Sequence, residues 1–118
     1  MKRLLPAAIV AFALGQPCLA FAADYAPIDC SKASSPADVT ICKTYSLGQA
    51  EARMATLYGI VMSLVAMGER GDVGYAQQQW LPTREACGDN VVCLTKAYND
   101  RIEQLNKVID VIASNGPY

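Results

Sequence analysis

The chain contains no histidine and only one tryptophan and two phenylalanines among its 118 residues. Without histidine, Ser-His-Asp and Cys-His catalysis in their usual forms are excluded. The glycine-rich segment 67–74 also lacks the lysine and the preceding strand of a phosphate-binding loop. No basic stretch is present that would follow a phosphate backbone, so nucleic acid is not an expected partner. These absences predict a protein that is not an enzyme, uses no cofactor or metal and has no small-molecule substrate.

The N-terminal residues 1–22 predict a secretory signal peptide. A short basic start precedes an apolar run over residues 4–14, and Ala20-Phe21-Ala22 forms a small-x-small cleavage site. The run is too short to span a membrane. A lipoprotein interpretation would centre on Cys18, but the residues before it are a poor lipobox. We therefore expect cleavage after Ala22, a single domain over residues 23–118, and a periplasmic or secreted protein without stable membrane insertion.

Apolar periodicity predicts two long amphipathic helices. In the segment 47–64 apolar residues recur at steps of three and four, and a similar spacing recurs over 91–113. The first stripe comprises Leu47, Ala50, Met54, Leu57, Val61 and Leu64. The second comprises Val91, Leu94, Tyr98, Ile102, Leu105, Ile109 and Ile112. Asp89 or Asn90 can cap the second helix. No run alternates with a period of two for long enough to predict a strand.

Two further helices complete the predicted fold. Ser35, Pro36 and Asp38 suit the N-cap, first and third positions of a helix of about two turns. Another helix is expected to begin near Gly74 and to bend or restart at Pro82. Because helices are predicted and no strand is, the predicted fold is all-α. Each amphipathic stripe needs a partner, so the helices are expected to pack into a bundle. It is a small, disulfide-stapled antiparallel helical bundle, with a short N-terminal helix, two long amphipathic helices and one shorter, kinked helix.

Four cysteines remain after the predicted cleavage, and an even number in a small exported domain indicates two disulfides. Their spacing does not fit a zinc site, and no pair has the two-residue spacing of a redox motif. Four cysteines allow three pairings. We favour the local one, Cys30 with Cys42 and Cys87 with Cys93, because the other pairings require all four ends to meet in space. Each short bridge is expected to contribute about 2–3 kcal/mol of stability.

An ordered pattern of residues runs through the chain. It reads Gln77-x-x-Trp80-Leu81-x-x-Arg84-x-x-Cys87 and then Cys93-Leu94-x-x-x-Tyr98-x-x-Arg101-Ile102-x-x-Leu105, with Asp29-Cys30-Ser31-Lys32-Ala33, Ile41-Cys42 and Leu57-Tyr58 upstream. This set resembles the LprI-type lysozyme-inhibitor family over about residues 28–105. The resemblance implies a small exported α-helical domain with two disulfides that inhibits c-type lysozyme by direct binding. The chain departs from the family pattern at Glu51, where aspartate is usual.

Four residues of this pattern have two interpretations: Trp80, Arg84, Tyr98 and Arg101. As a surface cluster they would form a binding hot spot, since Trp, Tyr and Arg dominate such sites. As structural residues, Trp80 and Tyr98 would pack between helices, and Arg84 would pair with Glu51 or another carboxylate. We favour the structural interpretation, because these residues, together with Gln77, lie beside a disulfide and in phase with the apolar stripes.

A loop over residues 68–74 is the candidate binding surface, because glycines interrupt the helical pattern and loops on a rigid scaffold often carry binding residues. Its Glu69 and Asp72 would meet the basic rim of a lysozyme cleft, and Arg70 would reach the catalytic carboxylates. The alternative is an ordinary solvated turn.

The charge of the mature chain is compatible with a basic protein partner. The whole chain has 10 basic and 11 acidic residues, and loss of two basic residues with the signal peptide leaves a net charge of −3. The predicted function is therefore an exported inhibitor that binds c-type lysozyme and protects bacterial peptidoglycan. The alternative is a structural or interaction module of the cell envelope without lysozyme activity.

Overall fold

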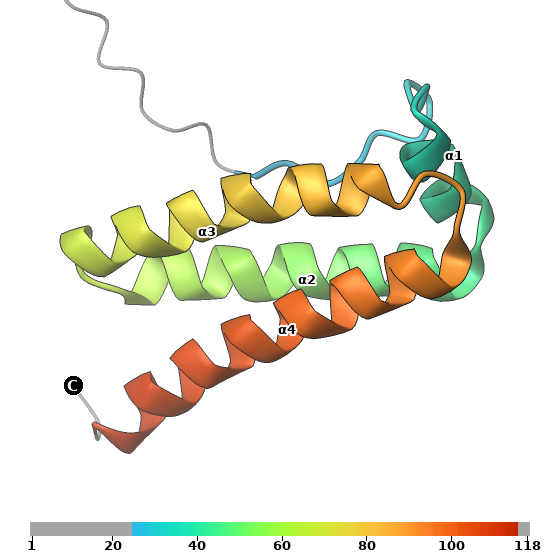
Figure 1. The fold of residues 1–118 in the computed structure, drawn as a ribbon. Coiled ribbons are helices and arrows are strands. Elements are labelled where there is room, and N and C mark those ends of the chain that lie inside the picture. The colour runs from blue at the N-terminus through green and yellow to red at the C-terminus, as the bar shows by residue number, and fades with distance from the viewer. Residues whose placement is uncertain (1–24, 116–118) are drawn as a thin grey trace, which may run out of the picture.

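Residues 25–115 form a bundle of four helices, and these are the residues that the computed structural model describes. The helices are α1 (Pro36–Lys43), α2 (Tyr45–Leu64), α3 (Met67–Ala86) and α4 (Val91–Ser114). The three long helices run alternately in opposite directions, and α1 lies at the end where α3 turns into α4 (Figure 1). No strand occurs in this part of the chain. The predicted all-α, disulfide-stapled bundle is confirmed, whereas the predicted signal peptide over 1–22 lies outside the described residues.

The N-terminal ends of α1 and α4 follow from local hydrogen bonds. The Ser35 side chain accepts a hydrogen bond of 3.0 Å from the backbone N–H of Asp38, and Pro36 is the first residue of α1. The Asn90 side chain accepts one of 3.0 Å from the N–H of Cys93. Asn90, one of the two predicted candidates, is therefore the N-cap of α4. Both caps satisfy N–H groups that the first turn of a helix leaves unpaired.

The buried face of α2 differs from the predicted stripe. Its buried residues are Leu47, Glu51, Met54, Tyr58 and Val61. Ala50 and Leu57 are only partly buried, and Leu64 is 53% exposed at the end of the helix. The predicted stripe was wrong at Leu64, whereas Ala50 and Leu57 do pack against the core. Glu51 was not in the apolar stripe, and it is buried because its carboxylate enters the core together with hydrogen-bond partners. Val91, predicted in the stripe of α4, is also exposed, at the point where that helix begins.

The predicted loop over residues 68–74 is wrong, because these residues form the first turns of α3. Only Val65 and Ala66 join α2 to α3. The third helix is therefore 20 residues long, as long as α2, and is not the shorter helix that was predicted. Each glycine inside a helix costs about 1 kcal/mol relative to alanine. Burial of Val73 in the core offsets part of this cost, and the local sequence does not reveal that contact.

Pro82 lies inside α3, and the helix continues past it to Ala86. Proline cannot donate a backbone hydrogen bond, so the carbonyl of Gln78 loses its usual helical partner. Because Gln78 and Pro82 are both exposed, water can replace the missing donor. Of the two predicted outcomes, a bend or a restart at Pro82, the restart does not occur.

Two disulfides fix the non-helical segments. Cys30–Cys42 joins the N-terminal segment to α1, and Cys87–Cys93 spans the turn between α3 and α4. The predicted local pairing is thus present. Gly88 in this turn has a φ of 56°, a conformation that other residues rarely adopt.

Two disulfides fit an oxidising, extracellular-type environment. Within residues 25–115, no helix is long and apolar enough to cross a membrane.

Candidate functional site

A buried carboxylate, that of Glu51, lies where the N-terminal segment, α2 and α4 meet. Glu51 is 6% exposed. The hydroxyls of Tyr25 and Tyr98 each donate a hydrogen bond of 2.5 Å to one of its two oxygens, and the N–H of Ile28 donates a longer one of 3.3 Å. Burial of a carboxylate is unfavourable unless donors compensate for lost water. These three donors therefore hold Glu51 in the core and fix the segment 25–29 against the helices.

Arg84 on α3 faces Glu51 and two further carboxylates. Its Nη2 lies 2.8 Å from Asp38 on α1 and 2.6 Å from Glu85, and its Nη1 lies 3.8 Å from Glu51. Nη1 also donates a hydrogen bond of 3.2 Å to the hydroxyl of Tyr25. The predicted pairing of Arg84 with Glu51 or another carboxylate is therefore present. We call Tyr25, Asp38, Glu51, Arg84 and Tyr98 the Glu51 cluster, which joins the N-terminal segment to all four helices.

Burial and hydrogen bonding set the protonation states in the Glu51 cluster. Burial raises the pKa of Tyr25 and of Tyr98 far above the ordinary value for tyrosine, and the hydrogen bonds to Glu51 raise it further. Both hydroxyls therefore stay protonated and able to donate. Burial opposes the charge of Arg84, but the hydrogen bond to Glu85 and the attraction of nearby groups leave its pKa above the ordinary value. Arg84 is thus one cation that faces carboxylates from three helices, those of Asp38, Glu51 and Glu85.

A second buried arginine, Arg101 on α4, is hydrogen-bonded to neutral groups. Its Nε donates to the side-chain oxygen of Gln77 at 2.8 Å, and its Nη2 donates to the backbone carbonyl of Val73 at 3.2 Å. Its Nη1 donates to the side-chain oxygen of Gln104 at 3.0 Å. The Gln77 amide also donates to the sulfur of Met54 at 3.4 Å. Burial lowers the pKa of Arg101 below its ordinary value. We call Met54, Val73, Gln77 and Arg101 the Arg101 cluster.

Trp80 and Tyr98 pack against each other inside the bundle. Their rings meet edge to face with centroids 5.2 Å apart, and the indole N–H of Trp80 donates to the carbonyl of Ala97 at 2.9 Å. The guanidinium of Arg84 lies 5.8 Å from the centre of the Trp80 ring. Trp80 is 7% exposed and Tyr98 is 0% exposed. These contacts support the structural interpretation of Trp80, Arg84, Tyr98 and Arg101 over a surface hot spot.

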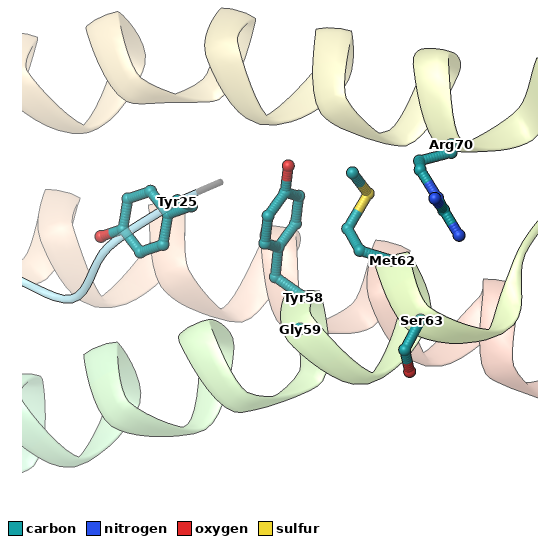
Figure 2. Close-up of a pocket in the computed structure, with 6 residues that line it drawn as sticks. All are labelled: Tyr25, Tyr58, Gly59, Met62, Ser63 and Arg70. Atoms are coloured by element: carbon teal, nitrogen blue, oxygen red, sulfur yellow. The ribbon is translucent and has the colours of Figure 1, made fainter. Parts of the chain in front are cut away.

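An open pocket of about 400 Å³ lies between α2, α3 and the N-terminal segment. Its lining residues are Tyr25, Tyr58, Gly59, Met62, Ser63 and Arg70. Figure 2 shows the side chains of Tyr25, Tyr58, Met62 and Arg70 in a row. The pocket is therefore aromatic at one end and cationic at the other.

The three predicted binding residues, Glu69, Arg70 and Asp72, are exposed on the first turns of α3. Residues three positions apart share one face of a helix, so Glu69 and Asp72 lie on the same face. Arg70 instead points into the space between α3 and α2, beside Met62 (Figure 2). The helix thus separates two acids from the cation, an arrangement that a loop interpretation did not predict.

Sequence reasoning missed the pocket and the core position of Glu51. One signal for Glu51 was available, because it lies four residues after Leu47 and three before Met54 and so shares their helix face. No local signal existed for Tyr25, since its hydrogen bonds to Glu51 and Arg84 span 26 and 59 residues of sequence.

The described residues contain no group of three or more His, Cys, Asp or Glu side chains placed to hold a metal ion. Comparison of the chain with known protein families, with curated proteins and with solved structures gives no match. The resemblance to the LprI-type family therefore depends on the pattern of residues alone.

Proposed function

We propose that the protein is an exported inhibitor that binds a c-type lysozyme and protects bacterial peptidoglycan, and that it is not itself an enzyme. The resemblance of the residue pattern to the LprI-type family supplies the lysozyme part of this proposal. The two disulfides support export, with the protein in the periplasm or secreted after removal of residues 1–22.

The observation that carries the proposal is the exposed acidic face at the start of α3. Glu69 and Asp72 lie on one face of a helix that is anchored by the buried side chain of Val73. A surface that is already ordered loses less conformational entropy on binding than a flexible loop does. An acidic face complements the basic rim of a lysozyme cleft, whereas Arg70 points between α3 and α2 and is not part of this face.

Inhibition is the first property to measure. The oxidised mature chain, residues 23–118, is titrated into a c-type lysozyme that is clearing a peptidoglycan suspension. We expect a saturable loss of lysis at near-stoichiometric ratios. No effect from a folded, correctly bridged protein would contradict the proposal and favour the alternative, a structural or interaction module of the cell envelope.

Two charge-matched double variants locate the binding face. Glu69→Gln with Asp72→Asn removes two acids from α3, and Asp100→Asn with Glu103→Gln removes two exposed acids at the same spacing from α4. We expect the α3 variant to weaken inhibition about fivefold, because each exposed ion pair contributes little on its own. The α4 variant should inhibit like the parent chain. Equal weakening by both variants would show that net charge matters and that the face of α3 does not.

A further inference from the structure

The pocket between α2 and α3 has a polarity that lysozyme binding does not require. At one end the rings of Tyr25 and Tyr58 meet edge to face with centroids 6.2 Å apart. Met62 continues this apolar wall, and the guanidinium of Arg70 lies beyond it (Figure 2). A ligand that fills such a pocket needs an apolar body and a negatively charged end.

Arg70 supplies an available cation at the pocket. It is exposed, and within residues 25–115 its guanidinium takes part in no ion pair. The six lining residues include no acid that would repel an anion. A guanidinium is planar and matches the two oxygens of a carboxylate with parallel N–H groups. Charge complementarity at this end of the pocket therefore favours a carboxylate.

The walls of the pocket are held in place by the core. The Tyr25 hydroxyl is fixed by its hydrogen bonds to Glu51 and Arg84, and Tyr58 is 5% exposed. Gly59 also lines the pocket, and the position where its Cβ would lie is open space. The absence of a side chain at this position therefore leaves room for a ligand.

We infer that this pocket binds an amphipathic carboxylate. The acid group pairs with Arg70, and an apolar or aromatic body lies against Met62 and the two tyrosine rings. The volume of about 400 Å³ is within the range of small-molecule sites, which is roughly 300–1,000 Å³. The ligand is bound and not transformed, and the inference holds whether or not the protein inhibits lysozyme.

The first probe is 4-phenylbutyrate, compared with 4-phenylbutanol, which has the same apolar body without the charge. Binding to the oxidised mature chain is followed by two-dimensional amide NMR. We expect saturable shifts centred on residues 58–63 and 70, with the alcohol binding about fivefold more weakly than the acid. No saturable shift at these residues with the acid overturns the inference, and so does equal binding of the acid and the alcohol.

Three variants separate the charge of the pocket from its volume. Arg70→Gln should weaken binding of the acid about fivefold, whereas Arg53→Gln, an exposed arginine on α2 that does not line the pocket, should leave it unchanged. Gly59→Leu should abolish binding by filling the pocket, while its higher helix propensity keeps the chain folded. Thermal unfolding checks the fold of each variant. Undiminished binding by Arg70→Gln or by Gly59→Leu would overturn the inference.

A carboxylate attached to an apolar body occurs both in free small acids and at the C-terminus of a protein that ends in an apolar residue. A tripeptide ending in phenylalanine is therefore tested as the free acid and as the amide. Tighter binding of the free peptide than of 4-phenylbutyrate supports a protein C-terminus as the ligand, and the reverse order supports a free acid. Equal binding of the peptide acid and its amide contradicts recognition of a carboxylate.

Discussion

Arg84 and Arg101 are both buried, at 5% and 3% exposure, but the groups around them differ in charge. Arg84 faces carboxylates from α1, α2 and α3, and its pKa lies above the ordinary value. Arg101 binds two side-chain amides and a backbone carbonyl, and burial lowers its pKa. The Glu51 cluster fixes a segment without regular structure to four helices, whereas the Arg101 cluster lies between long helices that already pack together. The comparison indicates that ion pairs fix the N-terminal segment, which has little apolar packing of its own, whereas the long helices are held together mainly by their apolar contacts.

The largest expected effect is a difference between Arg84→Met and Arg101→Met. Removal of Arg84 leaves the buried carboxylate of Glu51 without a nearby cation, which costs about 3–5 kcal/mol of stability. Removal of Arg101 leaves only neutral acceptors unpaired and also removes a buried charge, so we expect a loss of about 1–2 kcal/mol. Urea unfolding of the oxidised chain at pH 7 measures both values. Equal losses would contradict the distinction between the clusters.

A second substitution sharpens this test. If Arg84→Met is destabilised by an uncompensated carboxylate, adding Glu51→Gln should recover part of the lost free energy of unfolding, because the double variant buries no charge at position 51. The same Glu51→Gln change in the Arg101→Met chain should give no recovery, since Glu51 belongs to the other cluster. Recovery in neither background would remove the electrostatic explanation.

The next effect in size concerns the two disulfides. Replacing Cys30 and Cys42 by serine opens a bridge with a sequence separation of 12, and we expect a loss of about 3 kcal/mol. Replacing Cys87 and Cys93 opens a separation of 6, with an expected loss of about 2 kcal/mol. The first pair also holds the segment that the Glu51 cluster fixes, so its loss should couple with Tyr25→Phe. Additive losses in urea unfolding would argue against that coupling.

The smallest effect is a dependence on alkaline pH that belongs to the Glu51 cluster. The pKa of Tyr98 is raised in the folded chain, so its contribution to stability is present below the unfolded pKa near 10 and is lost as the pH rises above it. By pH 11 the loss for this fully buried group is about 1 kcal/mol. Urea unfolding at pH 8 and pH 11 should show a smaller decrease for Tyr98→Phe than for the parent chain. Arg101→Met should decrease like the parent.

Features set by neighbouring residues could be predicted from the sequence. The caps at Ser35 and Asn90 depend on side chains three positions from their donors, and both disulfides join cysteines that are close along the chain. The segment 68–74 was mispredicted because its glycines disfavour a helix locally, while the contacts that stabilise the helix come from residues far away. One of these is Arg101, which donates to the carbonyl of Val73 across 28 residues.

The candidate site was less predictable than the fold. Arg70 was identified from the sequence, but the apolar wall beside it was not, because nothing in the local sequence indicates that Tyr58 and Met62 line a pocket. Glu51 was left out of the predicted apolar stripe, and only its partners Tyr25 and Tyr98 explain its burial. A polar side chain is buried when donors that are distant in the sequence satisfy its hydrogen bonds. A single sequence does not show which donors those are.

The order of the cysteines has a consequence for how the chain acquires its bridges. Each disulfide joins two cysteines that are consecutive in the described chain, so the two loops are neither nested nor interlaced. In a chain that enters an oxidising compartment N-terminus first, Cys30 and Cys42 are both present before Cys87 arrives. Oxidation in order of arrival therefore produces the native pairing directly, without the thiol exchange that interlaced bridges require.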